Sequence, residues 1–397
     1  MENSQLQHSI PGDEKILFLK YGSFSNVNGS VLKILESEFP EYEIEELDAQ
    51  HLIKTQTSTI HFFINILYFI KEYGIQFLNK KKPWRSYKGW FLSTSYITLL
   101  LSKKIQKLCY GKNYIFTFQT QSLFNGKLPN IPNFIYTDHT TQTNLLYPDI
   151  DPQEYMRSKS WIKRAETKIY KDATMIFTFG SLVRHSLISQ YKIPAKKIIT
   201  TFTGSNVEIP NLHSIKDDSS KNILFVGGDW ERKGGPILIE VFEQVLKKHP
   251  DASLTVIGNS PKNLSLPNCA FIGKIPLEQL GDYYDSASIF CMPTLREPFG
   301  VSFVEAMKHK LPIISNNIGG LPDLVINDYN GYLINNDVEE YIKAICHLLD
   351  NPEKRKQMGE NGYNFALKNF TWQKVGETLK SNIKNALEKK KSAQMPI

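Results

Sequence analysis

Residues 222–235 (NILFVGGDWERKGG) join an apolar run directly to a glycine-rich loop that contains two adjacent cations. The apolar run has the length and the residue types of a buried β-strand. Residues 236–248 then place apolar side chains at helical spacing, so this stretch predicts a strand, a loop and a helix in succession. A strand followed by a crossover helix is the repeating unit of a parallel α/β sheet.

Further apolar runs of strand length occur on both sides of this stretch. Helix-length segments separate them, which favours an α/β protein with two parallel, doubly wound sheets. The expected strands are residues 15–20, 115–119, 133–137 and 174–179 in the first half, and 222–226, 253–258, 270–273, 287–293 and 312–316 in the second. A helix is expected from Ser30, after the loop 22–29 (GSFSNVNG), and a further one at 277–286.

A polar segment lies between the two series of strands. Residues 208–220 (EIPNLHSIKDDSS) contain few core-forming side chains, which is typical of the edge of a linker. We therefore expect a first domain over residues 1–205 and a second, residues 206–371, each Rossmann-like. Their strands would end at a shared cleft, where open α/β sheets bind ligands.

Composition excludes several classes of protein. The chain has 397 residues, of which 41% are apolar, so it can form two cores and is neither disordered nor fibrous. Its four cysteines show no metal-binding spacing, which favours a reduced, cytoplasmic compartment. The polar N-terminus does not resemble a secretory signal, and the longest apolar stretch, residues 60–70, is shorter than the roughly 20 residues of a membrane span.

The sharpest chemical signal is residues 297–305 (EPFGVSFVE). A loop ends in Pro-Phe-Gly and a largely apolar helix is expected from about Val301, which would bury Glu305. A buried carboxylate needs partners, and two vicinal ribose hydroxyls would satisfy it. Glu297 lies beside the backbone N–H groups of Phe299 and Gly300, an arrangement suited to a sugar hydroxyl near a diphosphate. The alternative is an ordinary helix start with a salt-bridged glutamate.

Two other loops follow expected strands. Arg232 and Lys233, in the glycine-rich loop after residues 222–226, would supply cations for a diphosphate; the alternative is a surface turn with solvated charges. In the first half, His139 and Asp138 follow residues 133–137, so His139 is a candidate catalytic residue, against a purely structural histidine.

A D-x-D sequence competes with this interpretation. Asp149-Ile150-Asp151 has the spacing of a metal–diphosphate clamp. However, Pro148 and Pro152 flank it and no apolar strand precedes it, so we interpret it as a turn.

Taken together, EPFGVSFVEAM, GGLPDLVINDYNGYLI (residues 319–334) and GGDWERKGG resemble the retaining GT-B glycosyltransferases, specifically glycosyltransferase family four. The resemblance spans the second half of the chain; in the first half it rests on the opening strand, the glycine loop and TDHTT (residues 137–141). It implies the GT-B fold, in which two Rossmann-like domains face each other across a cleft. It also implies that a C-terminal helix, at about 372–390, packs back on the first domain.

The resemblance assigns a role to each matching residue. Glu305 would hold the nucleotide ribose, and Glu297 the transferred sugar, assisted by the backbone amides of Phe299 and Gly300. Lys233 would bind the diphosphate, and His139 would lie beside the reacting sugar. The catalytic residues are thus His139, Glu297, Lys233 and Arg232, and the donor-binding residues are Gly22, Gly228, Arg232, Lys233, Glu297, Phe299, Gly300, Val301 and Glu305. Gly228 stands where the family commonly has an arginine, a place that Arg232 would take.

The expected reaction moves a sugar from a nucleotide-diphosphate sugar to a hydroxyl acceptor, a glycan or a lipid-linked molecule, with retention of configuration. Cations would stabilise the departing diphosphate, and neither a metal nor another cofactor is expected. Polysaccharide biosynthesis is the expected setting. The sugar, the base and the acceptor are left open. A GT-B sugar-nucleotide epimerase is the enzymatic alternative.

The positive charge of the chain is concentrated in one segment. Residues 71–112 contain ten basic residues and one acidic one, whereas the net charge of the whole chain is +7. A nucleic-acid-binding protein is the weaker interpretation, because it leaves the second half unexplained. Following the apolar residues 60–70, the cations favour an anionic membrane surface bound through residues 60–112, at the inner face of the cell membrane. The alternative is a solvated helix whose apolar side faces the core.

Overall fold

The computed structural model describes residues 14–56, 58–73, 94–147, 152–207, 220–261 and 263–394. Three features named above lie outside these residues: most of the expected linker, the D-x-D sequence at Asp149 and Asp151, and residues 74–93 of the basic segment.

The first half of the chain forms a six-stranded sheet in the order β2-β1-β3-β4-β5-β6, and all its paired strands are parallel. Its strands are β1 (Lys15–Lys20), β2 (Glu43–Asp48), β3 (Tyr114–Thr120), β4 (Asn133–Thr137), β5 (Met175–Thr178) and β6 (Ile198–Thr200). The described helices around it are α1 (Val27–Glu38), α2 (Ala49–Gln56), α3 (Thr59–Tyr73), α5 (Ser95–Leu108), α6 (Pro152–Asp172) and α7 (Ser181–Ser189).

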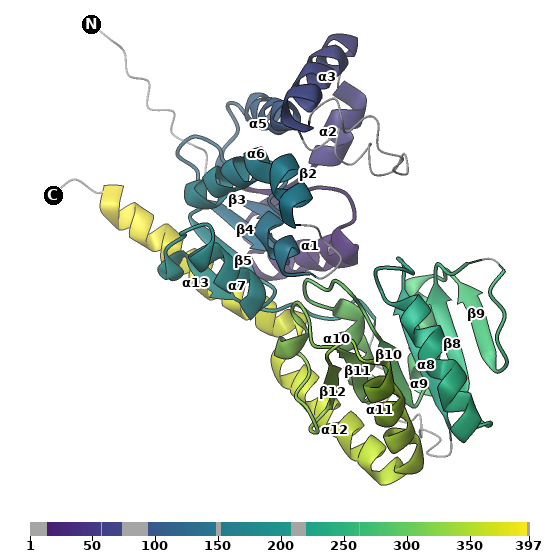
Figure 1. Ribbon diagram of the computed structural model, residues 1–397. Helices are drawn as coiled ribbons and strands as arrows, with labels where there is room; N and C mark the ends of the chain where they lie inside the picture. Colours follow the sequence, from purple (N-terminus) through teal and green to yellow (C-terminus); the bar gives the residue numbers. More distant parts are fainter. Residues whose placement is uncertain are drawn as a thin grey trace, which may run out of the picture.

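The second half repeats this design, with a parallel sheet in the order β12-β11-β10-β7-β8-β9. Its strands are β7 (Asn222–Gly227), β8 (Ser253–Gly258), β9 (Cys269–Gly273), β10 (Ile289–Met292), β11 (Ile313–Asn316) and β12 (Gly331–Ile334). The helices that accompany it are α8 (Gly235–Lys248), α9 (Leu280–Ser286), α10 (Val301–Lys308), α11 (Val338–Asp350) and α12 (Pro352–Asn369). The predicted fold of two Rossmann-like domains, with helices on both sides of each sheet, is confirmed (Figure 1).

The expected strands agree with the observed ones to within two residues, but three strands were not predicted. The clearest omission is β2, whose sequence EIEELD has no apolar run. It is an edge strand, and its carboxylates pair with lysines: Lys15 lies 2.9 Å from Glu43 and Lys20 lies 2.7 Å from Glu46. The prediction that α1 begins at Ser30 was wrong, because the helix already begins at Val27, after Asn26 in the left-handed conformation.

The last helix, α13 (Trp372–Gln394), crosses from the second half to the first, as Figure 1 shows. Its apolar residues Val375, Leu379 and Ile383 are fully buried. A Cβ atom on Gly376 would approach Ile34 of α1 to 3.2 Å, so the two helices lie in close contact. Lys380 of α13 pairs with Glu38 of α1 at 3.1 Å. The boundary near residue 206 stays a prediction.

Candidate functional site

A cavity of about 650 Å³ lies between the two halves of the molecule. Its lining joins the ends of β7, β8 and β9 and the start of α10 to residues of the first half. The first half contributes Asn26, Asp138, Phe179 and Asn206; the second contributes Val226, Gly227, Gly228, Arg232, Lys233, Ile257, Gly258, Lys274, Ile275, Leu277, Leu280, Glu297, Pro298, Phe299, Gly300, Val301, Ser302 and Glu305. All the predicted donor-binding residues of the second half therefore surround one space.

The loop after β7 is held against the loop that precedes α10. Gly234 has φ +76°, and a Cβ atom there would lie 1.9 Å from the carbonyl oxygen of Pro293, so only glycine fits. Arg232 donates from its guanidinium to the carbonyl oxygen of Arg296 at 2.7 Å. A Cβ atom on Gly228 would meet nothing within 4 Å, so packing does not require glycine at that position.

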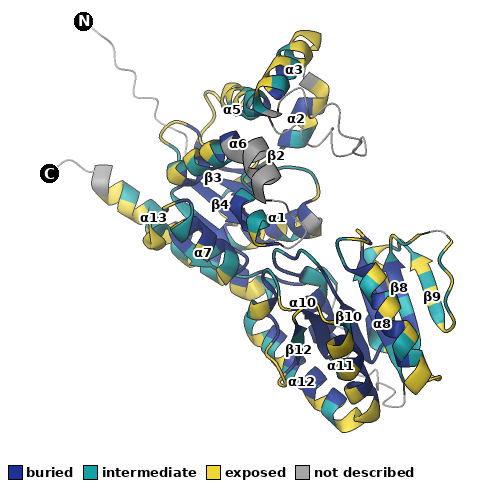
Figure 2. Ribbon diagram, viewed as in Figure 1, coloured by how far each residue is buried: buried dark blue, intermediate teal, exposed yellow. Residues whose placement is uncertain are grey.

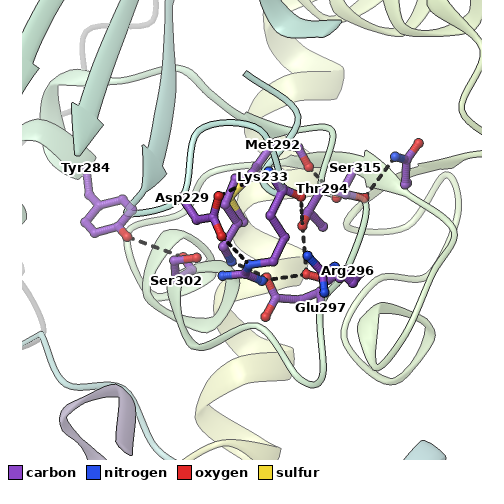
Figure 3. Close-up of polar contacts among 11 residues, drawn as sticks. Asp229, Lys233, Tyr284, Met292, Thr294, Arg296, Glu297, Ser302 and Ser315 are labelled. Carbon is purple, nitrogen blue, oxygen red and sulfur yellow. Dashed lines mark hydrogen bonds and ion pairs between the residues drawn. The ribbon is translucent and has the colours of Figure 1, made fainter. Parts of the chain in front are cut away.

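Lys233 and Glu297 form an ion pair at the side of the cavity (Figure 3). Their side chains are only 11% and 8% exposed. Burial lowers the pKa of Lys233, whereas the carboxylate of Glu297 opposes that shift. The pair thus places the Nζ atom of Lys233 beside the cavity, where an anionic ligand could share it.

Glu305 lies on the buried face of α10, and its carboxylate accepts hydrogen bonds from two other parts of the chain. Tyr284 donates its hydroxyl to one carboxylate oxygen at 3.0 Å, and the backbone N–H of Asn206 donates to the other at 3.3 Å. Burial raises the pKa of Glu305 to about 7, although these two hydrogen bonds and the nearby Lys308 act to lower it. Each oxygen of a carboxylate can accept two hydrogen bonds, so both retain capacity for a ligand hydroxyl.

The ring of Tyr284 is held in place by His309. Its ring stacks on that of His309 with the centroids 5.1 Å apart, and His309 in turn contacts Asp285 through Nδ1 at 2.8 Å. These three residues therefore form a support for Glu305 on the side away from the cavity.

Helix α10 begins at the cavity. Gly300 precedes it with φ +108°, a backbone conformation that turns the chain into the helix and that a side chain would strain. The first N–H groups of a helix have no partner within the helix and present a partial positive charge. The start of α10 therefore suits the anionic part of a ligand, next to Lys233.

The first half contributes Asp138 to the cavity, and His139 is its neighbour in the chain without being part of the lining. His139 contacts Asn144 through Nε2 at 2.9 Å. Burial raises the pKa of Asp138, an effect that His139 opposes and Glu297 adds to. Of the 22–29 loop, Asn26 lines the cavity and Gly22 does not. The carbonyl oxygen of Gly22 instead accepts a hydrogen bond from the side chain of Asn28 at 2.7 Å. The roles of His139 and Gly22 stay predictions.

A buried glutamate supports the loop that carries Asp138 and His139. Glu166 of α6 accepts from the backbone N–H of Thr141 at 3.1 Å, from Tyr170 at 3.0 Å and from Ser122 at 2.8 Å. Tyr191 is a further donor to the same carboxylate. Since each donor comes from a different part of the first half, this network fixes where the loop meets the cavity.

The two halves also contact each other directly at the start of α7. Both the N–H and the hydroxyl of Ser181 donate to the carboxylate of Asp323, each at 2.6 Å. Gly180 must be glycine for this contact, because a Cβ atom there would lie 2.7 Å from that carboxylate. Phe179 and Phe299 add an edge-to-face contact between the halves, with the ring centroids 5.9 Å apart.

Asp323→Ala is expected to lower the free energy of unfolding by about 1 kcal/mol, because the start of α7 loses its cap. It should also open the cleft, because a contact between the two halves is lost. Asp337→Ala is the matched control, since Asp337 caps α11 within the second half through the N–H of Glu340 at 3.1 Å. Both variants should lose similar stability by denaturant unfolding, but only Asp323→Ala should increase the radius of gyration in X-ray scattering. Equal scattering from both would contradict a closing role for Asp323.

Sequence reasoning missed several residues of the site. Tyr284 and Asn206 hold Glu305 but lie in polar segments without a motif, and only the fold brings them to α10. Gly258 ends the expected strand 253–258 and Lys274 follows the expected strand 270–273, so their positions at strand ends could have indicated them.

Within the described residues, no group of three or more His, Cys, Asp or Glu side chains could hold a metal ion. No described helix is long and apolar enough to cross a bilayer.

Residues 210–365 match the model of a protein family described as "Glycosyl transferases group 1". An uncharacterized glycosyltransferase of Haemophilus influenzae is 34% identical over 36% of this chain and 43% of its own length. The chain covers between 41% and 67% of the length of four curated relatives that it matches.

Solved structures match along almost the whole chain. Sucrose-phosphate synthase from Thermosynechococcus elongatus superimposes with a TM-score of 0.67 at 16% identity, over 94% of this chain and 100% of that one. HepE of Anabaena, in complex with UDP and glucose, gives 0.62 at 13% identity, over 93% and 99% of the two chains. The structures establish the shared two-domain fold, and the family match and the relatives support a transferase of the glycosyltransferase class.

Proposed function

We propose that the protein transfers a sugar from a nucleotide-diphosphate sugar to a hydroxyl acceptor, with retention of the anomeric configuration. One observation carries this proposal: a single cavity between two parallel sheets contains a buried carboxylate, Glu305, and two adjacent cations, Arg232 and Lys233. A ribose with two vicinal hydroxyls fits the first, and a diphosphate fits the second.

The donor would extend from Glu305 toward Glu297. The carboxylate of Glu305 would accept from the ribose hydroxyls, and the diphosphate would lie at the start of α10 beside Lys233. Glu297 then reaches the hydroxyls of the transferred sugar, assisted by the backbone amides of Phe299 and Gly300. The presence of UDP and glucose in the HepE complex supports a nucleotide-sugar donor of this kind.

The chemistry would depend mainly on charge. As the bond between the sugar and the diphosphate breaks, Lys233, Arg232 and the first amides of α10 would stabilise the negative charge on the leaving group. The acceptor hydroxyl would approach from the first half, on the face that the diphosphate leaves, and the leaving phosphate would take its proton. No metal is part of this proposal.

The acceptor would bind on the side of Asp138 and His139. A glycan or a lipid-linked acceptor, in polysaccharide biosynthesis, is the class that we propose. The network around Glu166 keeps the 138–141 loop in place, so the acceptor would meet a prearranged surface.

A panel of nucleotide-diphosphate sugars tests the proposal. Binding is measured by calorimetry, and the best donor is then incubated with and without acceptors while nucleotide release and sugar products are followed. Glu305→Ala, Lys233→Ala and His139→Ala should each slow transfer at least about tenfold, and the product should have the anomeric configuration of the donor, read from the coupling constants of its anomeric carbon and proton.

Lys221→Ala is the control, because Lys221 pairs with Asp251 on the surface at 2.8 Å and does not line the cavity. Rates close to that of the unmodified protein in all three site variants would contradict the assignment. A product that forms from the donor alone, with an inverted sugar centre, would indicate an epimerase instead.

A further inference from the structure

Three polar residues of α3 contact the start of α5. His61 contacts the hydroxyl of Tyr96, and Asn65 accepts from Thr94, both at the start of α5. Glu72 accepts from the backbone N–H of Ser95 at 3.0 Å. These polar residues lie on the side of α3 that contacts the fold, together with the buried Phe69, whereas several other apolar residues of the helix are exposed.

The opposite side of α3 is an exposed apolar stripe, which we define as Ile60, Phe63 and Leu67. The spacing of three and four residues places them along one face of the helix. Their exposed fractions are 70%, 61% and 68%. Surface helices ordinarily turn such a stripe to the core, so its exposure on α3 indicates a contact outside the described fold. Figure 2 shows much of its surface as exposed.

Basic residues are concentrated in the sequence that follows α3. Between residues 73 and 113 the sequence has nine lysine or arginine residues and no aspartate or glutamate. In the part of this region that the structure describes, Lys103 and Lys107 are exposed on α5, the helix that packs on α3. Exposed apolar residues lie beside them, namely Leu99 at 53% and Tyr110 at 89%.

We propose that the apolar stripe, together with the exposed Lys103 and Lys107 of α5, forms a docking surface for an anionic lipid bilayer. Apolar side chains that enter the boundary between headgroups and acyl chains, with basic side chains on anionic headgroups, are the two contributions that bind interfacial helices. A second copy of the chain fits this surface less well, because it would bring two strongly basic regions together.

The position of α3 agrees with this role. Helices α2, α3 and α5 form a group at the end of the first half that faces away from the second half (Figure 1). A bilayer at this end would leave the second half free to move relative to the first. The contact would be peripheral, since the 15 residues of α3 are fewer than a span requires.

Vesicle sedimentation tests the proposal. The full chain, without nucleotide or acceptor, is mixed with vesicles of phosphatidylcholine alone or with about a third phosphatidylglycerol. We expect sedimentation with the anionic vesicles, and at least about a tenfold weaker partition coefficient for Phe63→Ser/Leu67→Ser, because two large apolar side chains no longer enter the lipid.

The matched control is Ile272→Ser/Ile326→Ser, which removes two exposed apolar side chains, 39% and 47% exposed, from the second half. It should bind like the unmodified chain. Leu67→Trp adds a gain of signal: with anionic vesicles its tryptophan emission should shift further to the blue than that of the unmodified chain, which contains five tryptophans.

Three results would overturn the proposal: no sedimentation of the unmodified chain with anionic vesicles, equal sedimentation with neutral ones, or unchanged binding of Phe63→Ser/Leu67→Ser. A dimer in solution that this variant dissociates would instead assign the stripe to a second copy. Because the assay contains no donor or acceptor, its outcome is independent of the transfer reaction.

Discussion

Lys233→Met is expected to lower both the transfer rate and the stability of the protein. The rate should fall by about a hundred- to a thousandfold, because the leaving diphosphate loses a preorganised cation. The free energy of unfolding should fall by about 3–5 kcal/mol, because Glu297 would remain buried without its partner. Initial rates with the best donor and denaturant unfolding measure the two effects.

A second variant separates these effects. Lys233→Met/Glu297→Gln removes both charges of the pair, so most of the lost stability should return. The transfer rate should stay low, because the cation is still absent and Glu297 can no longer hold the sugar as a carboxylate. A double variant that regains the rate together with the stability would show that Lys233 has only a structural role. Lys221→Met, which breaks a surface pair, serves as the control for both measurements.

Donor binding should strengthen as the pH rises through about 7, the pKa to which burial raises Glu305. Ribose hydroxyls donate to the ionised carboxylate, so at lower pH the ligand must first displace a proton. If the nucleotide binds only the ionised form, its affinity should be about tenfold higher at pH 8 than at pH 6. Calorimetry with a nucleoside diphosphate measures the slope.

The control for this prediction is Glu305→Gln, which keeps the shape of the side chain but cannot ionise. Its affinity should be lower, and any pH dependence that remains belongs to the phosphate of the ligand itself. A slope that is the same in Glu305→Gln and in the unmodified protein would remove Glu305 from the ribose site.

The stability of the ligand-free protein should change with pH in the opposite direction. Since the pKa of Glu305 is higher in the folded state than in the unfolded chain, the folded state binds more protons over this interval. Its contribution to stability is therefore present below the unfolded pKa of 4.5 and is lost as the pH rises through about 7. Glu305→Gln should flatten this part of the curve of unfolding free energy against pH.

The sequence predicted those parts of the site that depend on local pattern. The loop after β7 and the start of α10 combine an apolar run with glycine and charge, so their place at strand ends and helix starts was visible. Tyr284 and Asp323 depend on contacts with residues 21 and 142 positions away, and no local pattern indicates them. β2 escaped prediction because lysines outside the strand satisfy its carboxylates.

Helix α3 shows why pattern alone did not settle the orientation of an amphipathic segment. Residues 60–70 are equally compatible with an apolar side in the core and with one outside. The orientation of the helix is decided by its partners at the start of α5, where Thr94, Ser95 and Tyr96 contact the polar residues of α3. Those contacts span at least 23 positions and follow from the tertiary fold.

The return of α13 to the first half limits how such a protein can be recombined. A chimera that joined residues 1–205 to the second half of a relative would place a foreign last helix against α1, where Gly376 and the buried Val375, Leu379 and Ile383 now fit. If the first half binds the acceptor, as proposed above, an exchange of acceptor specificity would need to carry two separate pieces of the chain, the first half and α13. The first half and α13 therefore form one structural unit that is discontinuous in sequence and has to be exchanged as a whole.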